Sequence, residues 1–192
     1  MKLKFYDDMI PGTKLNRSEM EGATGLGFLK KVFFVSDKVM LTQIRNISGI
    51  DSSTLQNWTK RGWVATSKLK KYDMDQVAHI LIINMLRACM QLESIDFLIH
   101  YINGDVENKD DDIVSDSVLY DYICKILDRI TQSDTCELAT IGRYVKEITA
   151  DYVEPFEGAS ERLDRALEII VITYYAAHIK HRADELLTEL KR

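Results

Sequence analysis

The segment from Asp73 to Leu86 carries the strongest folding signal in the chain. Apolar residues recur in it every three or four positions, which is the spacing of one face of an α-helix. These residues are Val77, Ala78, Leu81, Ile82, Met85 and Leu86. Asp73, followed three residues later by Gln76, forms a capping-box pattern that starts a helix. The 192 residues include only 2 Pro and 9 Gly, few turn-forming residues for a fold of many strands. We therefore predict an all-α protein.

Apolar spacing and end signals predict further helices on both sides of this segment. Their expected ranges are 42–48, 52–61, 92–102, 116–130, 134–153 and 160–190. Thr42 and Asp51 suit the N-cap position, because their side-chain oxygens can accept a hydrogen bond from a free N–H at a helix start. Gly49 can adopt the left-handed conformation that ends a helix. The middle of the last helix is apolar on nearly all sides, so we expect it to be buried all round, inside a bundle or across a dimer interface.

Composition divides the chain into four parts. Residues 1–33 contain turn signals but no clear period, and their structure is left unassigned. Residues 34–104 contain the first four helices, and residues 105–114 form an acidic linker. Residues 115–192 are predicted to be a helical domain that serves dimerisation or effector binding.

Charge is distributed unevenly along the chain. The formal net charge is -5, yet residues 51–71 carry five basic residues against one acidic residue, or +4. Residues 105–121 carry seven acidic residues against one lysine, or -6. A local basic patch on an acidic protein is typical of a surface that meets DNA phosphates. An ordinary solvated surface with fluctuating charge gives the same pattern and stays an alternative.

Several classes of protein lack support in the sequence. The three cysteines, Cys89, Cys124 and Cys136, are widely spaced and indicate buried thiols of a reduced, cytoplasmic protein. The start of the chain does not resemble a signal peptide, and no apolar stretch is long enough to span a membrane. There is no glycine-rich phosphate loop, nucleophile elbow or zinc-hydrolase signature. We therefore predict a protein that is not an enzyme and that has no cofactor or metal.

The helix expected at 52–61 has an apolar face and a polar face. Leu55 and Trp58 are three positions apart and face inward. The residues on the opposite face, spaced at i, i+3, i+4 and i+7, are Ser53, Gln56, Asn57 and Lys60. Glutamine and asparagine can pair with adenine, and lysine can donate to guanine or to phosphate. These four residues are the candidates for reading DNA bases.

A helix, a glycine turn, a second helix, a basic loop and a further amphipathic helix follow one another here, which is the plan of a winged helix-turn-helix. The expected core of this unit is Ile44, Ile47, Gly49, Leu55, Trp58 and Tyr72. The candidates for binding DNA phosphates are Arg61, Lys68, Lys70 and Lys71. These basic residues could equally be ordinary surface side chains, and Trp58 could stack on a base instead of packing in the core.

The stretch LTQIRNISGIDSSTLQNW, residues 41–58, resembles the start of MerR-type transcription regulators. Ser48-Gly49-Ile50 lies at the turn, and Thr54-Leu55 matches a Thr-Leu pair of those proteins. Gly62-Trp63-Val64 resembles the end of their recognition helix, and Lys70-Lys71-Tyr72 resembles the end of their wing. The resemblance covers about residues 41–102 and implies a MerR-like winged helix-turn-helix followed by a helical C-terminal domain.

A second resemblance concerns the segments STLQNWTKRGWV, KKYDMDQVAHILIINMLR and YINGD. They are similar to an uncharacterised bacterial family, a domain of unknown function that is described as MerR-like. The chain departs from MerR-type regulators at Gln56-Asn57-Trp58, where those proteins have Arg-Tyr-Tyr. It also lacks the cysteine arrangement of their metal-sensing members.

Together these patterns favour a sequence-specific DNA-binding protein that regulates transcription. The expected partner is double-stranded DNA, bound by a homodimer that forms through the C-terminal helices. A small-molecule effector stays open, and a membrane partner is not expected. Two alternatives remain. One is a protein–protein interaction module built on a winged-helix scaffold, and the other is an excisionase-like architectural DNA binder.

Overall fold

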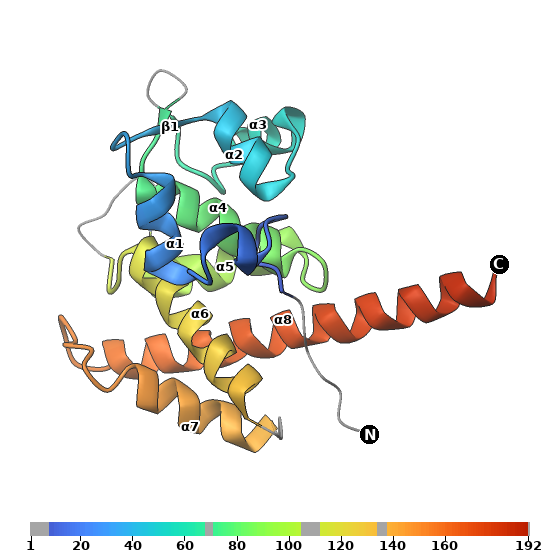
Figure 1. Ribbon diagram of the computed structural model, residues 1–192. Helices are drawn as coiled ribbons and strands as arrows, with labels where there is room; N and C mark the ends of the chain where they lie inside the picture. Colours follow the sequence, from blue (N-terminus) through green and yellow to red (C-terminus); the bar gives the residue numbers. More distant parts are fainter. Residues whose placement is uncertain (1–7, 68–70, 105–111, 134–137, 192) are drawn as a thin grey trace.

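The computed structural model describes residues 8–67, 71–104, 112–133 and 138–191. This part of the chain is mostly helical, with one two-stranded sheet (Figure 1). Its elements are η1 Arg17–Met20, α1 Gly25–Val32, β1 Val39–Met40, α2 Leu41–Ser48, α3 Ser52–Lys60, β2 Lys71–Tyr72, α4 Met74–Leu86, α5 Leu92–Asn103, α6 Asp116–Gln132, α7 Leu138–Ile148 and α8 Ala159–Leu190. The prediction of a mainly helical protein is confirmed.

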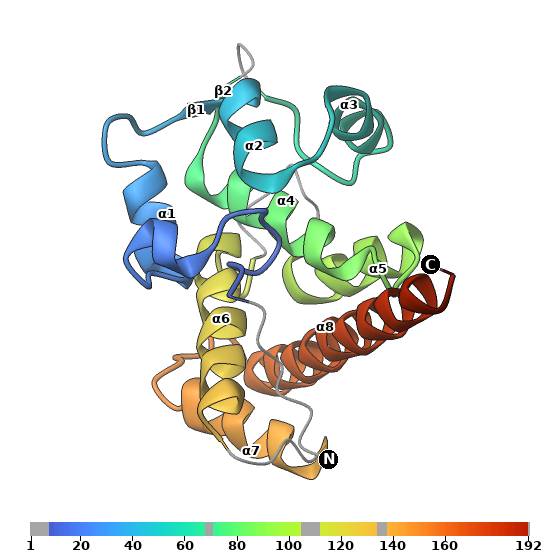
Figure 2. The same cartoon turned by 45° about the vertical axis from the view of Figure 1, so that its right-hand side comes forward.

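Helix α4 lies at the centre of the molecule (Figures 1 and 2). Nine of its 13 residues are buried, including His79, Ile80 and Ile83, which lie outside the stripe read from the sequence. More residues of α4 are buried than the apolar stripe predicted, because α2, α5, α6 and α8 cover this helix from several sides. A helix enclosed in this way needs apolar side chains around most of its circumference.

Helix α6 joins the upper and lower parts of the molecule (Figure 1). It packs against α1 and α4 as well as against α7 and α8. One cluster of buried apolar residues extends from Ile10 to Tyr175 through both parts. On the two sides of residues 105–111, Asn103 donates to the Val114 carbonyl oxygen over 2.6 Å and accepts from the Val114 N–H over 3.3 Å. The division into two domains at 105–114 stays a prediction about folding units, and the core itself is shared.

The segment before α2, which the sequence left unassigned, packs against α6. The Asp121 carboxylate accepts a hydrogen bond of 2.8 Å from the Leu26 N–H at the start of α1. Thr24 donates to Asp128 over 2.9 Å, and the Tyr120 hydroxyl donates to the Pro11 carbonyl oxygen over 2.7 Å. A negative charge at a helix N-terminus is favourable, because the first N–H groups of the helix have no partner within it.

The structure tests the predicted helix ends. Asp51 and Asp73 cap α3 and α4 as expected, and Gly49 ends α2 with a φ of 74°. Thr42 was wrong as an N-cap, because α2 begins at Leu41 and its N-cap position is Met40. The N–H of Met40 donates instead to the Gln43 side chain over 2.8 Å.

The helix expected at 134–153 also needs correction. Helix α7 ends at Ile148, five residues earlier than predicted from the position of the proline. Its expected start at 134–137 lies outside the described residues.

A buried histidine connects three parts of the fold. His79 is 4% exposed, and its Nδ1 lies 3.0 Å from the Asp116 carboxylate while its Nε2 lies 2.8 Å from the Trp63 carbonyl oxygen. Both neighbours are acceptors, so the ring donates from both nitrogens only when it is a protonated imidazolium. Burial alone would lower the pKa of His79, but the charge of Asp116 and the two hydrogen bonds outweigh it and raise the pKa above its ordinary value. This ion pair joins α4, the start of α6 and the segment that follows α3.

Raising the pH is expected to destabilise the native state through His79. The unfolded histidine has a pKa near 6.5, and the native pKa is higher. The stabilisation from His79 is therefore complete below about pH 6.5 and is lost as the pH rises through the native pKa. Urea unfolding should show a falling free energy of unfolding over that range. His79→Gln should cost about 3 kcal/mol at low pH and make the pH dependence shallower.

The control for this experiment is His181→Gln, because His181 has a side chain 74% exposed on α8. This variant should keep the pH slope of the unchanged protein. If His79→Gln kept that slope as well, the protonated assignment of His79 would be wrong.

Gly12 allows the N-terminal turn to approach α4 closely. Its φ is 74°, and a Cβ there would lie 2.3 Å from the Leu81 carbonyl oxygen. Gly12→Ala is expected to lower the free energy of unfolding by about 2–4 kcal/mol, from left-handed strain together with the backbone clash. Gly22 has a φ of 77° and nothing within 4 Å, so Gly22→Ala should cost only about 1 kcal/mol. Equal losses in the two variants, measured by urea unfolding, would contradict the close packing.

Candidate nucleic-acid interface

The turn between α2 and α3 is fixed by hydrogen bonds to two polar side chains, the buried Ser48 and the half-buried Asn84. The Ser48 hydroxyl donates to the Ile44 carbonyl oxygen over 2.7 Å and accepts from the Ile50 N–H over 3.1 Å. The Asn84 side chain on α4 donates to the Ser48 carbonyl oxygen over 3.0 Å and to the Gly12 carbonyl oxygen over 2.8 Å. The turn is therefore held against the central helix.

Strands β1 and β2 close the segment that contains α2 and α3. They pair antiparallel, with Val39 opposite Tyr72 and Met40 opposite Lys71. Val39 and Tyr72 are buried, whereas Met40 and Lys71 are exposed. This pairing holds the residues just before α2 beside the residues just before α4.

Five of the six expected core residues lie on the inner side of this segment, whereas Gly49 was wrong as a core residue, because it is exposed at the turn after α2. Ile44, Leu55 and Trp58 are each 1% exposed, and Tyr72 is 6% exposed. Ile47 is half-buried and packs against the core. Trp58 is thus enclosed in the protein and has no free ring face to offer to a base.

The four candidate base-reading residues share the outer side of α3. Ser53, Gln56, Asn57 and Lys60 are all exposed. Figures 1 and 2 show α3 at the margin of the molecule. The Ser53 hydroxyl donates to the Asp51 carboxylate that caps α3, so its proton is engaged and its oxygen can still accept. Hydrogen bonds from Ser53 and Thr54 keep the pKa of Asp51 well below its usual range, so this cap is negatively charged.

The candidate phosphate-binding residues are only partly described. Lys68 and Lys70 lie outside the described residues, and Lys71 is exposed on β2. Arg61 is exposed, but its guanidinium lies 4.9 Å from the centroid of the Trp63 ring and 3.7 Å from Glu93 on α5. Arg61 would have to leave this exposed ion pair to bind a phosphate, at a cost of at most about 1 kcal/mol.

Two further exposed basic residues, which the sequence pattern did not indicate, lie on α2 or beside its end. Lys14 lies beside the α2–α3 turn, where its Cδ would be 3.7 Å from a Cβ on Gly49. Arg45 is exposed on α2. Among the described carboxylates, none forms an ion pair with Lys14, Arg45, Lys60 or Lys71. The exposure of Arg45 could have been predicted from helical spacing, because Ile44 faces inward. The position of Lys14 beside the α2–α3 turn depends on tertiary packing and could not be predicted in this way.

The charge of this segment contrasts with that of the whole chain. Residues 39–72 contain six basic residues and one acidic residue, a net charge of +5, while the whole chain has -5. The acidic residue, Asp51, caps α3 through its carboxylate. The described part of this segment therefore exposes both basic and amide side chains.

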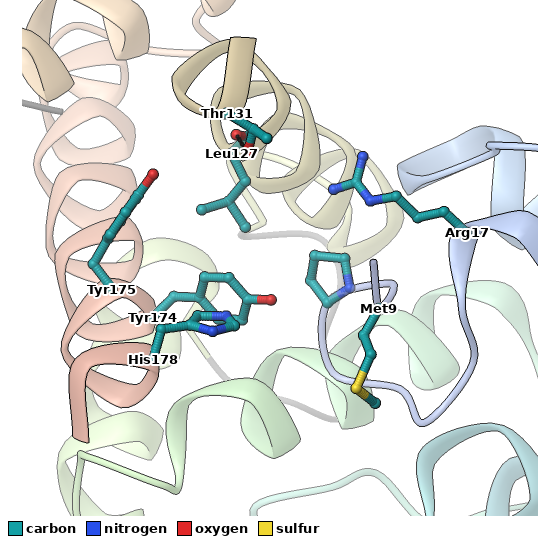
Figure 3. A pocket seen from close by; sticks show the side chains of 8 residues that line it. Met9, Arg17, Leu127, Thr131, Tyr174, Tyr175 and His178 are labelled. Atoms are coloured by element: carbon teal, nitrogen blue, oxygen red, sulfur yellow. Dashed lines mark hydrogen bonds between the residues drawn. The ribbon is translucent and has the colours of Figure 1, made fainter. Parts of the chain in front are cut away.

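A small pocket lies between α6, α8 and the N-terminal segment (Figure 3). It is lined in part by Arg17, Leu127, Tyr174 and His178, and its volume of about 20 Å³ is that of roughly one water molecule. Sites for small organic ligands are roughly 300–1,000 Å³, so this pocket does not supply the effector site that the sequence left open.

The described ranges hold neither a metal cluster nor a reactive thiolate at Cys124. Within residues 8–67, 71–104, 112–133 and 138–191, no group of three His, Cys, Asp or Glu side chains is placed to hold a metal ion. Burial raises the pKa of the Cys124 thiol to about 12, so it is a thiol rather than a thiolate. Cys89 is exposed, so the prediction of buried thiols is wrong there, and Cys136 lies outside the described residues. None of the described helices combines the length and the apolar character of a membrane span.

The family described as "Domain of unknown function (DUF1836)" matches residues 28–123 of the chain, which is half of its length. The chain belongs to this family. It is also 22% identical over 162 residues to the "Uncharacterized protein YkrK" of Bacillus subtilis (strain 168), a match that covers 79% of this chain and 70% of that protein. No solved structure gives a significant match to the chain.

The DUF1836 match begins in α1 and ends within α6, so it extends past the acidic segment at 105–114. The structure gives a reason for this extent. Asp116 on α6 binds His79, which lies inside the matched range. Asp121 on α6 binds the start of α1, which lies just before that range. The first turns of α6 are thus part of the same packed unit as the candidate interface.

Proposed function

We propose that this DUF1836 protein binds double-stranded DNA in a sequence-specific manner and regulates transcription. The observation that supports this most is the outer side of α3. Gln56 and Asn57 are exposed there next to Lys60, while Leu55 and Trp58 on the inner side fix the helix to the core. A short helix that is anchored on one side and carries amide side chains on the other has the form of a recognition helix in the major groove.

The order of elements supports the same proposal. Helix α2, a left-handed glycine turn, helix α3, strand β2 and helix α4 follow one another as in a MerR-like winged helix-turn-helix. In this arrangement Gln56 and Asn57 would each pair with an adenine, and Lys60 would donate to a guanine. Lys14, Arg45, Arg61, Lys71 and the two lysines at 68 and 70 would bind phosphates around that contact.

A second candidate function rests on a different surface. Phe34 and Val35 lie between α1 and β1 and are 88% and 93% exposed, and Met40 on β1 is 52% exposed. Large apolar residues that are close in sequence and exposed in this way are typical of surfaces that bind another protein. A protein–protein interaction module built on the same scaffold would use this side and would not need the basic residues around α3.

DNA binding should weaken steeply with salt. With the six basic residues named above near phosphates in each protomer, the logarithm of the association constant is expected to fall against the logarithm of salt concentration with a slope of about -5 per protomer. Fluorescence anisotropy with duplexes selected from a random pool measures this slope between roughly 50 and 200 mM salt. Absence of binding at the lowest salt by folded protein would favour the interaction module. Binding of all duplexes with equal strength and strong bending would favour an excisionase-like architectural role.

Base preference and general affinity should depend on different residues. Gln56→Ala and Asn57→Ala are each expected to cost about 1–3 kcal/mol on the preferred duplex and little on unrelated duplexes. Lys71→Ala should weaken binding to all duplexes alike and lower the magnitude of the salt slope by about 1. The matched controls are Gln132→Ala on α6 and Lys146→Ala on α7, both exposed and remote from α3 in sequence. If the Gln56 and Asn57 variants kept the original base preference, α3 would not be the reading helix.

A further inference from the structure

The C-terminal part of α8 extends beyond the rest of the molecule (Figure 1). Every residue from 179 to 191 is exposed, yet Ile179, Leu186 and Leu187 are 51%, 46% and 51% exposed and Leu190 is 84% exposed. An isolated helix of this length is marginal in water, and most helical stability in proteins comes from packing of an apolar face. The exposed leucines and isoleucine therefore indicate an apolar face that packs against a partner.

The exposed apolar residues form one continuous stripe along α8. Their spacing alternates between three and four residues, which is the heptad pattern of a coiled coil. The stripe consists of Ile169, Ile172, Ala176, Ile179, Ala183, Leu186 and Leu190, and all seven are exposed. We call this set the α8 seam. It spans 22 residues, or about three heptads and roughly 33 Å of helix. The preceding position in the pattern is Arg165, which pairs with Glu161 and ends the seam.

The α8 seam is separate from the side of α8 that packs within the chain. Leu167, Ile170, Val171 and Tyr175 are buried in the core. The sequence predicted that the middle of this helix is buried all round, inside a bundle or across a dimer interface. Within the single chain one side is buried and the side of the seam is exposed. Within the described ranges of the chain, no residue covers the seam.

We propose that the α8 seam packs against the α8 seam of a second copy of this chain, as a two-stranded coiled coil. Both a and d positions of the pattern are apolar throughout, as knobs-into-holes packing requires. The two alanines leave room for the partner's larger side chains and let the helix axes approach closely. The same seam on both copies gives a self-complementary, closed contact, whereas an unrelated partner would have to supply a matching heptad stripe.

Charges beside the seam are compatible with a second copy. Residues 178–191 contain three basic residues and three acidic residues, so this part of α8 has no net charge to repel its copy. The e and g positions, which flank the seam, include Lys180, Arg182 and Glu189 of both signs, as is usual in coiled coils. Lys180 pairs with Asp184 over 2.7 Å and Arg182 with Glu185 over 2.9 Å within the helix.

The experiment is sedimentation equilibrium of the full chain at micromolar concentrations, without DNA and with a reductant because Cys89 is an exposed thiol. The unchanged protein is expected to be a dimer. Ile179→Glu and Leu186→Glu each place two charges in the seam of the dimer and should raise the dissociation constant at least about 100-fold. Because both residues are exposed in the single chain, the variants should fold with unchanged circular dichroism. The matched control is Val153→Glu, an exposed apolar residue outside α8 that should leave the dimer intact.

Each other result would overturn the proposal. A monomeric full chain at tens of micromolar would show that the seam does not pair with a copy. A dimer that persists in both seam variants, or that is lost in Val153→Glu as well, would place the contact elsewhere. Since the measurement contains no DNA, it is independent of whether α3 binds a duplex.

Discussion

The burial of α4 on nearly all sides is the constraint around which the described elements are arranged. Nine of its 13 residues are buried, and α2, α5, α6 and α8 each cover part of its surface. Such a helix also has to satisfy any polar group it carries into the core. His79 meets this requirement because its two ring nitrogens lie within hydrogen-bonding distance of the Trp63 carbonyl oxygen and the Asp116 carboxylate. The burial of α4 thus fixes the position of the segment after α3 and of the first turn of α6.

Features that depend on neighbours a few residues away could be read from the sequence. Asp51, Asp73 and Gly49 have the roles expected of them, because a cap or a left-handed turn is formed within about four residues. The exposure of Gln56 and Asn57 followed from helical spacing for the same reason. This local part of the candidate interface could therefore be predicted from the order of the residues alone.

Features that depend on contacts across the chain could not be read. Lys14 reaches the α2–α3 turn because Gly12 packs on α4, and α1 is placed by Asp121, which lies about 95 positions later. The apolar residues of α8 predicted that this helix is buried, but they did not distinguish the side that packs within the chain from the side that is left exposed. Spacing alone gives the same prediction for a helix enclosed by its own chain and for one enclosed by a second copy.

The candidate interface and the α8 seam are joined through packed structure as well as through the chain. The segment that follows α3 is held by the contact of Trp63 with His79 on α4, and α4 packs against α8. Near its start, α8 is tied to α5 by Arg162, which donates to the Tyr101 carbonyl oxygen over 3.0 Å and to the Ile102 carbonyl oxygen over 3.2 Å. In the proposed dimer, therefore, the distance between the two α3 helices is set by buried contacts rather than by the length of a linker. Because a pair of recognition helices binds DNA only when their separation matches the repeat of the double helix, the seam and the His79 contact would together select the spacing of the two half-sites.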